Sequence, residues 1–199
     1  TIAIIQSILA PLDINKSDYE KELSGYLGQA IKHIWQTKES MSNKPTVVEY
    51  GVQPQQPVCS LIIPIYGRYD FVKYQITQFS QDEFMASAEI IYVLDDPRLL
   101  SEFNRYCDSV YTIFKMPFKT VSYSKNLGFA GANNIGVSQA KSEYVLLLNS
   151  DVMPKYSGWL EKMIDTYTEL ETPGILGARL LFEDNTIQHD GLMYQKLKQ

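Results

Sequence analysis

The stretches SLIIPIYGR (residues 60–68) and EIIYVLDDP (residues 89–97) decide the fold of this chain. Each opens with a short, nearly continuous apolar run, which is typical of a strand buried on both faces of a parallel sheet. A similar run, EYVLLL (residues 143–148), predicts another buried strand. Helical patterns lie between these runs. Strands that alternate with helices predict an α/β sandwich of three layers with a mainly parallel central sheet.

The remaining elements follow from apolar spacing and from helix start signals. The expected strands span residues 58–65, 89–94, 110–114, 143–148 and 175–182. The expected helices begin after Asp70, at Pro97, at Gly131 and at Ser157. Asp70 and Asp96 stand at N-cap positions, where a carboxylate can accept hydrogen bonds from free backbone N–H groups.

The first 57 residues have a different pattern. Residues 17–36 predict a helix with one apolar face, which packs either on the chain's own domain or on an upstream domain. Residues 37–57 are polar and contain Pro45, Pro54 and Pro57, which indicates a linker. We therefore expect an N-terminal helical segment and linker at 1–57, followed by the α/β domain at 58–199.

The composition excludes several classes of protein. Hydrophobic residues make up 45% of the chain and charged residues 21%, which excludes wholesale disorder. The net charge of −5 argues against a nucleic-acid binder. Two cysteines are too few for a disulfide framework, which favours a reducing, cytoplasmic location. The apolar start at 1–9 is too short to span a bilayer. Because the first residue is Thr1, we expect a processed or excised piece.

Polar residues follow three of the expected strands. These segments are Pro64-Ile65-Tyr66-Gly67-Arg68, Asp95-Asp96 and Asn149-Ser150-Asp151. Because ligands bind beyond the carboxyl ends of parallel strands, we expect the three segments to line one crevice.

Asp95 and Asp151 are the side chains with the clearest possible chemistry. Asp95 can accept a hydrogen bond from a ring N–H of a nucleobase, or it is a solvated turn residue. Asp96 has the alternative role of capping the helix that begins at Pro97. Asp151 can bind Mg²⁺ or Mn²⁺ together with substrate phosphates, or it belongs to a turn before Pro154.

Residues 124–136 (SKNLGFAGANNIG) contain many small residues, which let a helix begin close to an anion or to the sheet. Their spacing differs from the dinucleotide-binding fingerprint, so an NAD-binding domain is disfavoured.

These motifs, in this order, resemble the family-two glycosyltransferases, which have the Rossmann-like GT-A fold and invert at the anomeric carbon. The similarity runs from Val58 to about Tyr194 and includes YVLLLNSDV (144–152) and GARLLFEDNTIQHDG (177–191). The glycine- and asparagine-rich block at 124–136, followed by an Asn-x-Asp motif, is most similar to bacterial rhamnosyltransferase-like members.

The resemblance implies a site for a UDP- or dTDP-sugar and for a divalent cation, Mn²⁺ or Mg²⁺. The implied nucleotide-binding residues are Pro64, Ile65, Tyr66, Asp95, Asp96, Lys125 and Gly128. The implied metal ligand is Asp151, with Asn149 at the position where the family pattern has its first aspartate. The implied reaction transfers a sugar to a saccharide acceptor with inversion, in polysaccharide biosynthesis for the cell envelope, in the cytoplasm or at the cytoplasmic face of the membrane.

The catalytic base of such enzymes lies well downstream of the metal motif. Asp184, His189 and Asp190 are the downstream candidates here, and we assign the role to none of them. Asp184 lies in Glu-Asp-Asn, which predicts a hairpin turn. His189 and Asp190 either flank the sugar pocket or end a strand. We therefore expect a domain truncated on its C-terminal side and inactive alone. The alternatives are a non-catalytic sugar-nucleotide-binding module and a nucleotidyltransferase of similar fold.

Overall fold

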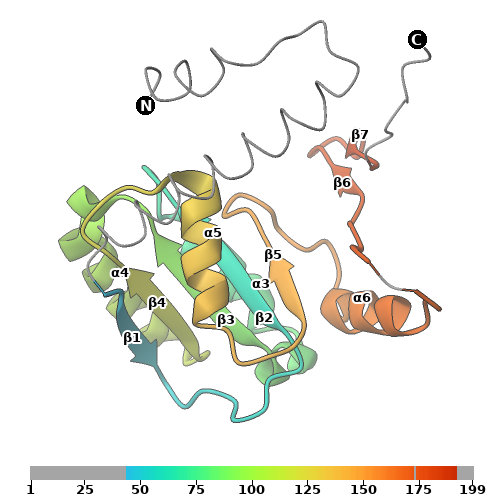
Figure 1. Ribbon diagram of the computed structural model, residues 1–199, viewed down its shortest axis with the longest axis horizontal. Coiled ribbons are helices and arrows are strands. Elements are labelled where there is room, and N and C mark those ends of the chain that lie inside the picture. Colours follow the sequence, from blue (N-terminus) through green and yellow to red (C-terminus); the bar gives the residue numbers. More distant parts are fainter. Residues whose placement is uncertain (1–43, 173, 192–199) are drawn as a thin grey trace, which may run out of the picture.

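A computed structural model describes residues 44–172 and 174–191 (Figure 1). The predicted helix at 17–36 lies outside these residues. Among the described residues, no helix is both long and apolar enough to cross a membrane.

The core of the domain is a five-stranded sheet with the strand order β1-β4-β3-β2-β5. Its strands are β1 (Thr46–Tyr50), β2 (Ser60–Ile65), β3 (Glu89–Leu94), β4 (Phe118–Ser122) and β5 (Val145–Leu147). β1 runs antiparallel to β4, and every other pair is parallel. Ser60 is paired with Glu89 and Ile65 with Leu94, so β2 and β3 begin and end together. The expected mainly parallel sheet is confirmed.

Helices cover both faces of this sheet and complete the expected three layers (Figure 1). The helices are α3 (Phe71–Phe79), α4 (Leu100–Phe114), α5 (Gly128–Ser138) and α6 (Trp159–Thr168), with short 3₁₀ helices at Glu83–Ser87 and Pro97–Leu99. Alternate residues of β2 point to opposite faces. Ile63 packs with α3, α4 and α6, whereas Ile62 packs with α5. The two faces therefore carry separate apolar cores.

α5 approaches the sheet closely because its inner face consists of small residues. Ala132 and Gly136 are buried against β2 and β3. A Cβ atom at Gly136 would lie 2.3 Å from Cγ2 of Ile62 and 2.9 Å from Cγ2 of Val93. α5 begins at Gly128, three residues earlier than we expected from the sequence.

The predicted strand at 110–114 is wrong. These residues form the last turn of α4, which ends where Lys115 adopts a left-handed conformation (φ 56°). Phe103, Cys107 and Val110 are buried at helical spacing, and this packing outweighs the strand preference of the run VYTIF. The strand of this region is instead β4.

Two other expectations also fail. Residues 46–50, which we interpreted as linker, form β1 at the edge of the sheet. The strand predicted at 175–182 shrinks to β6 (Leu180–Leu181), which pairs with β7 (Ile187–His189) in a separate hairpin. The predicted turn at Asp184 is confirmed, because Oδ1 of Asp184 accepts a hydrogen bond from the backbone N–H of Thr186 at 2.9 Å.

β5 is less buried than its apolar sequence predicts. Val145 and Leu147 are 39% and 56% exposed. Within the described residues β5 pairs with β2 alone, so it forms an edge of the sheet. The helix predicted after Ser157 is present as α6, and its apolar face is turned inward, with Leu160 fully buried.

Candidate functional site

A cleft of about 460 Å³ lies at the carboxyl ends of β2, β3 and β5, beside the beginning of α5. It is lined by Pro64, Tyr66, Asp95, Asn126, Gly128, Phe129, Ala132, Asn149, Ser150 and Asp151. The fold therefore brings all three polar strand ends of the sequence together in one place.

The side chain of Asp95 is fixed in this cleft by burial and by hydrogen bonds. Its backbone N–H donates to the carbonyl of Ile65 at 2.9 Å, which continues the β2–β3 pairing beyond the strands. Its side chain is only 3% exposed. Oδ1 accepts hydrogen bonds from the Tyr123 hydroxyl and from the backbone N–H of Leu127, both at 2.7 Å. Oδ2 accepts one from Nδ2 of Asn126 at 3.0 Å. Asp95 is therefore not a solvated turn residue.

The donors to Asp95 all come from the segment that joins β4 to α5. Nδ2 of Asn126 also donates to the backbone carbonyl of Asp95 at 2.8 Å. Burial, together with the hydrogen bond to Asp95, raises the pKa of Tyr123 well above its usual value. Tyr123 thus stays a hydrogen-bond donor, and Oδ2, with one donor among the described residues, retains a lone pair for a ligand.

Asp96 does not line the cleft. Its Oδ1 accepts from the backbone N–H of Arg98 at 3.3 Å, which confirms the predicted cap. Both carboxylate oxygens also bind the Arg98 guanidinium, each at 2.8 Å. The pKa of Asp96 is lowered, chiefly by this bond to Arg98.

Two other residues of the implied nucleotide set also lie away from the cleft wall. The side chain of Ile65 is fully buried in the core beneath the sheet end. Lys125 is exposed and does not line the cleft.

Asp70 stands at the N-cap of α3 but makes no capping hydrogen bond, because its carboxylate binds Arg68 instead, at 2.6 and 3.1 Å.

Two aromatic rings flank the cleft and remain open to solvent. Tyr66 is 62% exposed and Phe129 is 63% exposed. Exposed rings of this kind offer flat apolar surfaces for a base or a sugar. Sequence reasoning did not assign a role to Phe129, Asn126, Ala132 or Ser150. All but Ser150 lie in the block at 124–136, whose composition was the available signal.

Asp151 lies at the tip of a tight turn. The backbone N–H of Val152 donates to the carbonyl of Asn149 at 3.2 Å, which closes the turn and presents Ser150 and Asp151 at its tip. Asp151 is exposed, and within the described residues its carboxylate has no hydrogen-bond or ion-pair partner. The turn and the metal interpretations of this segment are therefore compatible.

This donor set fits a divalent cation that the substrate helps to hold. The described residues contain no group of three or more His, Cys, Asp and Glu side chains suited to a metal ion. Mg²⁺ and similar hard cations are commonly held by one or two carboxylates together with substrate phosphates. The carboxylate of Asp151 meets that requirement once a diphosphate completes the ligands, and Asn149, which lines the same cleft, carries a further amide oxygen.

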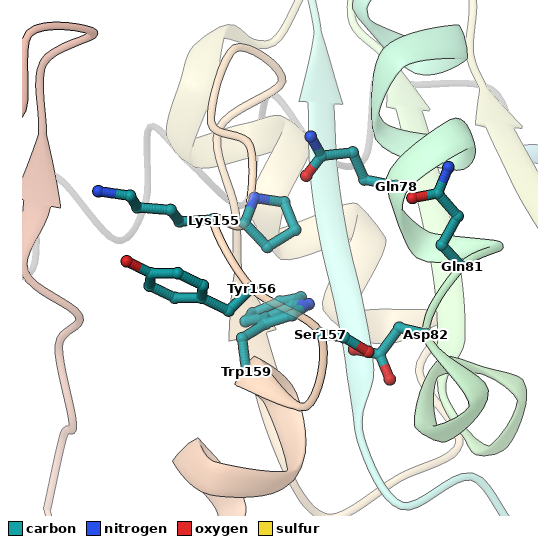
Figure 2. A pocket seen from close by; sticks show the side chains of 8 residues that line it. Gln78, Gln81, Asp82, Lys155, Tyr156, Ser157 and Trp159 are labelled. Atoms are coloured by element: carbon teal, nitrogen blue, oxygen red, sulfur yellow. The ribbon is translucent and has the colours of Figure 1, made fainter.

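A second, smaller hollow of about 130 Å³ lies between the end of α3 and the loop before α6 (Figure 2). Figure 2 shows Trp159 and Asp82 at its lower rim. Asp82 binds the backbone N–H groups of Phe84 (3.1 Å) and Gly158 (2.7 Å), so its role is to join two helix starts. None of the residues predicted for the site lies here.

The downstream acidic and histidine residues do not reach the cleft. Asp184 is held in its hairpin turn, and His189 belongs to β7. Asp190 pairs with Arg179 at 2.8 Å. None of these three side chains lines the cleft.

Comparison with known proteins identifies the family. The model of glycosyl transferase family 2 matches residues 60–191. The chain belongs to this family, and its three-layer sandwich is the GT-A fold.

Two curated relatives are much longer than this chain. It is 24% identical over 171 residues to the O-antigen biosynthesis protein RfbC of Myxococcus xanthus, covering 81% of this chain and 13% of RfbC. It is 31% identical over 70 residues to the uncharacterized protein y4gI of Sinorhizobium fredii, covering 35% of this chain and 8% of that protein.

Solved structures that the chain matches include the mannosyltransferase PcManGT from Pyrobaculum calidifontis in complex with GDP-Man and Mn²⁺. The identity is 16% and the TM-score 0.46, over 80% of this chain and 43% of that one. The S. aureus protein TarS (residues 1–349) is 22% identical with a TM-score of 0.43, over 55% of this chain and 33% of that one.

Proposed function

We propose that this domain binds the nucleotide-sugar donor of a glycosyltransferase, with a UDP- or dTDP-sugar as the donor. The observation that supports this proposal most is the cleft that joins Tyr66, Asp95 and Asp151 at the carboxyl ends of three parallel strands. Membership of glycosyl transferase family 2 supplies the reaction class.

Asp95 is suited to select the base. Uracil and thymine carry a ring N–H that can donate to Oδ2, and a hydrogen bond to a charged acceptor contributes about 1.5–3 kcal/mol. The exposed ring of Tyr66 stands beside this position and offers a surface for the base or the ribose. The diphosphate then extends along the cleft towards the turn at 149–152.

Asp151, with Asn149, would hold a divalent cation against the diphosphate. When bound, the cation stabilises the negative charge that develops on the leaving nucleoside diphosphate. The sugar is transferred to a hydroxyl of a saccharide, with inversion: the bond from the anomeric carbon to the diphosphate breaks as the bond to the acceptor oxygen forms, and a base removes the hydroxyl proton.

We further propose that the 199-residue chain alone transfers sugar poorly. Asp184, His189 and Asp190 do not line the cleft, so none of them is placed to take the acceptor's proton. A positioned general base contributes about 10²–10⁴-fold. The same observation favours a second candidate function, a donor-binding module without catalysis of its own.

Titration calorimetry with UDP and with dTDP, each with and without Mn²⁺, tests the proposal. We expect binding that Mn²⁺ strengthens, and we expect Asp151→Ala to abolish the Mn²⁺ effect without lowering the thermal unfolding temperature. Asp165→Ala is the matched control, because Asp165 is an exposed aspartate on α6 that does not line the cleft. A folded wild-type chain that binds neither nucleotide would refute donor binding.

A further inference from the structure

Gln75 is a buried polar residue that the donor-binding proposal does not use. It lies on α3, one turn after the helix begins, and its side chain is fully buried. The other buried positions of this helix are Val72, Ile76 and Phe79, which are apolar and fill the core. Buried polar groups are usually hydrogen-bonded, and here the amide nitrogen is bonded whereas Oε1 has no partner among the described residues, so the presence of this side chain needs a specific explanation.

The partners of Gln75 are both carbonyl groups of the turn that carries Asp151. Nε2 of Gln75 donates to the carbonyl of Asn149 at 3.1 Å and to the carbonyl of Val152 at 3.0 Å. Because carbonyl oxygens only accept, the nitrogen of the amide must face them. Its two N–H groups thereby bind the first and the last residue of the turn, which are 74 and 77 positions away in sequence.

We propose that Gln75 is a positioning residue that fixes the 149–152 turn, and with it Asp151, relative to β2 and the cleft. The inference rests on the proposed metal role of Asp151. The turn follows an edge strand of three residues and has one internal hydrogen bond, from Val152 to Asn149. The two bonds from Gln75 attach this turn to a helix that is packed into the core.

The positioning role predicts that metal affinity depends on Gln75. Groups that orient a metal ligand typically change metal affinity or activity by about 10–100-fold when they are removed. Without the two N–H donors, the turn is no longer held in place in the wall of the cleft, and Asp151 would no longer be oriented towards a cation on the diphosphate. Binding of the nucleoside near Asp95 does not depend on this turn, so metal-free binding stays unchanged.

The test compares Gln75→Met with the wild-type chain and with Gln78→Met. Methionine has nearly the length of glutamine but donates no hydrogen bond. Gln78 is an exposed glutamine on the same helix, and Figure 2 shows it beside the smaller hollow. The measurements are calorimetry with UDP, with and without Mn²⁺, and hydrogen exchange of the amides of residues 149–152.

We expect Gln75→Met to lose about 10–100-fold of the Mn²⁺ enhancement and to exchange the amides of this turn faster, whereas Gln78→Met behaves as wild type. If Gln75→Met fails to fold, Gln75→Leu replaces it with the same expectation. A folded variant with the wild-type Mn²⁺ enhancement, or with wild-type amide exchange, overturns the positioning role alone. If Mn²⁺ does not change the affinity of the wild-type chain for UDP, the metal role of Asp151 is refuted, and the positioning role of Gln75 is refuted as well.

Discussion

Replacing Asp95 by asparagine tests the proposal that this cleft selects a nucleobase. The wild-type carboxylate accepts three hydrogen bonds, from Tyr123, Leu127 and Asn126. The asparagine oxygen can still accept the first two, but its NH₂ group faces the NH₂ group of Asn126 and loses the third bond. Hydrogen bonds to a charged acceptor contribute about 1.5–3 kcal/mol each, and neutral ones about 0.5–1.5 kcal/mol.

These magnitudes set the expected cost of the Asp95→Asn change. The neutral amide avoids the desolvation of a buried charge, which offsets part of the lost hydrogen bonding. We therefore expect the free energy of unfolding to fall by about 1–3 kcal/mol, which leaves a folded protein to assay. The bond to the base N–H loses about 1.5–3 kcal/mol, so the affinity for UDP falls about 10–100-fold.

The comparison of UDP with CDP is the sharper measurement. Cytosine has an acceptor where uracil has its ring N–H, so the wild-type carboxylate repels it, whereas the NH₂ group of an asparagine can donate to it. Calorimetry with both nucleotides and Mn²⁺ should show a wild-type preference for UDP that Asp95→Asn loses. Asp96→Asn is the matched control, because Asp96 binds Arg98 and does not line the cleft. A folded Asp95→Asn chain that keeps the wild-type preference would refute base selection by Asp95.

Two further predictions concern the free energy of unfolding and its dependence on pH. Gly136→Ala forces a Cβ atom against Ile62, so it should lower the free energy of unfolding, measured in urea, by about 1–3 kcal/mol. Gly174→Ala is the control, because a Cβ atom there meets no atom within 4 Å and should leave the free energy of unfolding unchanged. Equal effects of the two changes would contradict the close packing of α5. Burial by itself raises the pKa of Glu89, but Lys119 (2.5 Å away), Ser60 and a backbone N–H outweigh it, so the pKa is lowered. The resulting stability is therefore fully present above the ordinary glutamate pKa of about 4.5, and it is lost as the pH falls through the lower pKa of the folded state. Glu89→Gln should flatten this pH dependence of the free energy of unfolding in acid. An unchanged slope would contradict this account of Glu89.

Several parts of the fold and site could be predicted because short-range rules decide them. The apolar runs of β2 and β3 are too short for helices and too apolar for the surface, so they form central strands. The cap at Asp96 and the hairpin turn at Asp184 depend on backbone groups within two residues. The meeting of the three strand ends followed from parallel pairing alone.

Other features depended on contacts between residues far apart in the chain. The run at 110–114 suits a strand by itself, and its burial at helical spacing against the sheet made it part of α4. Residues 46–50 (TVVEY) are rich in strand-favouring residues, but they lie within a polar, proline-containing segment, and their pairing with the edge of β4 placed them in the sheet.

The detailed chemistry of the cleft also belongs to this second group. Asp95 is positioned by donors about 30 residues away, and the turn of Asp151 is held by Gln75 on another element. The sequence by itself determined which residues could bind a nucleotide and a cation, since residue type and strand position are local properties. Only the tertiary structure decided which of them face the cleft, because a side chain's direction and partners depend on how distant elements pack.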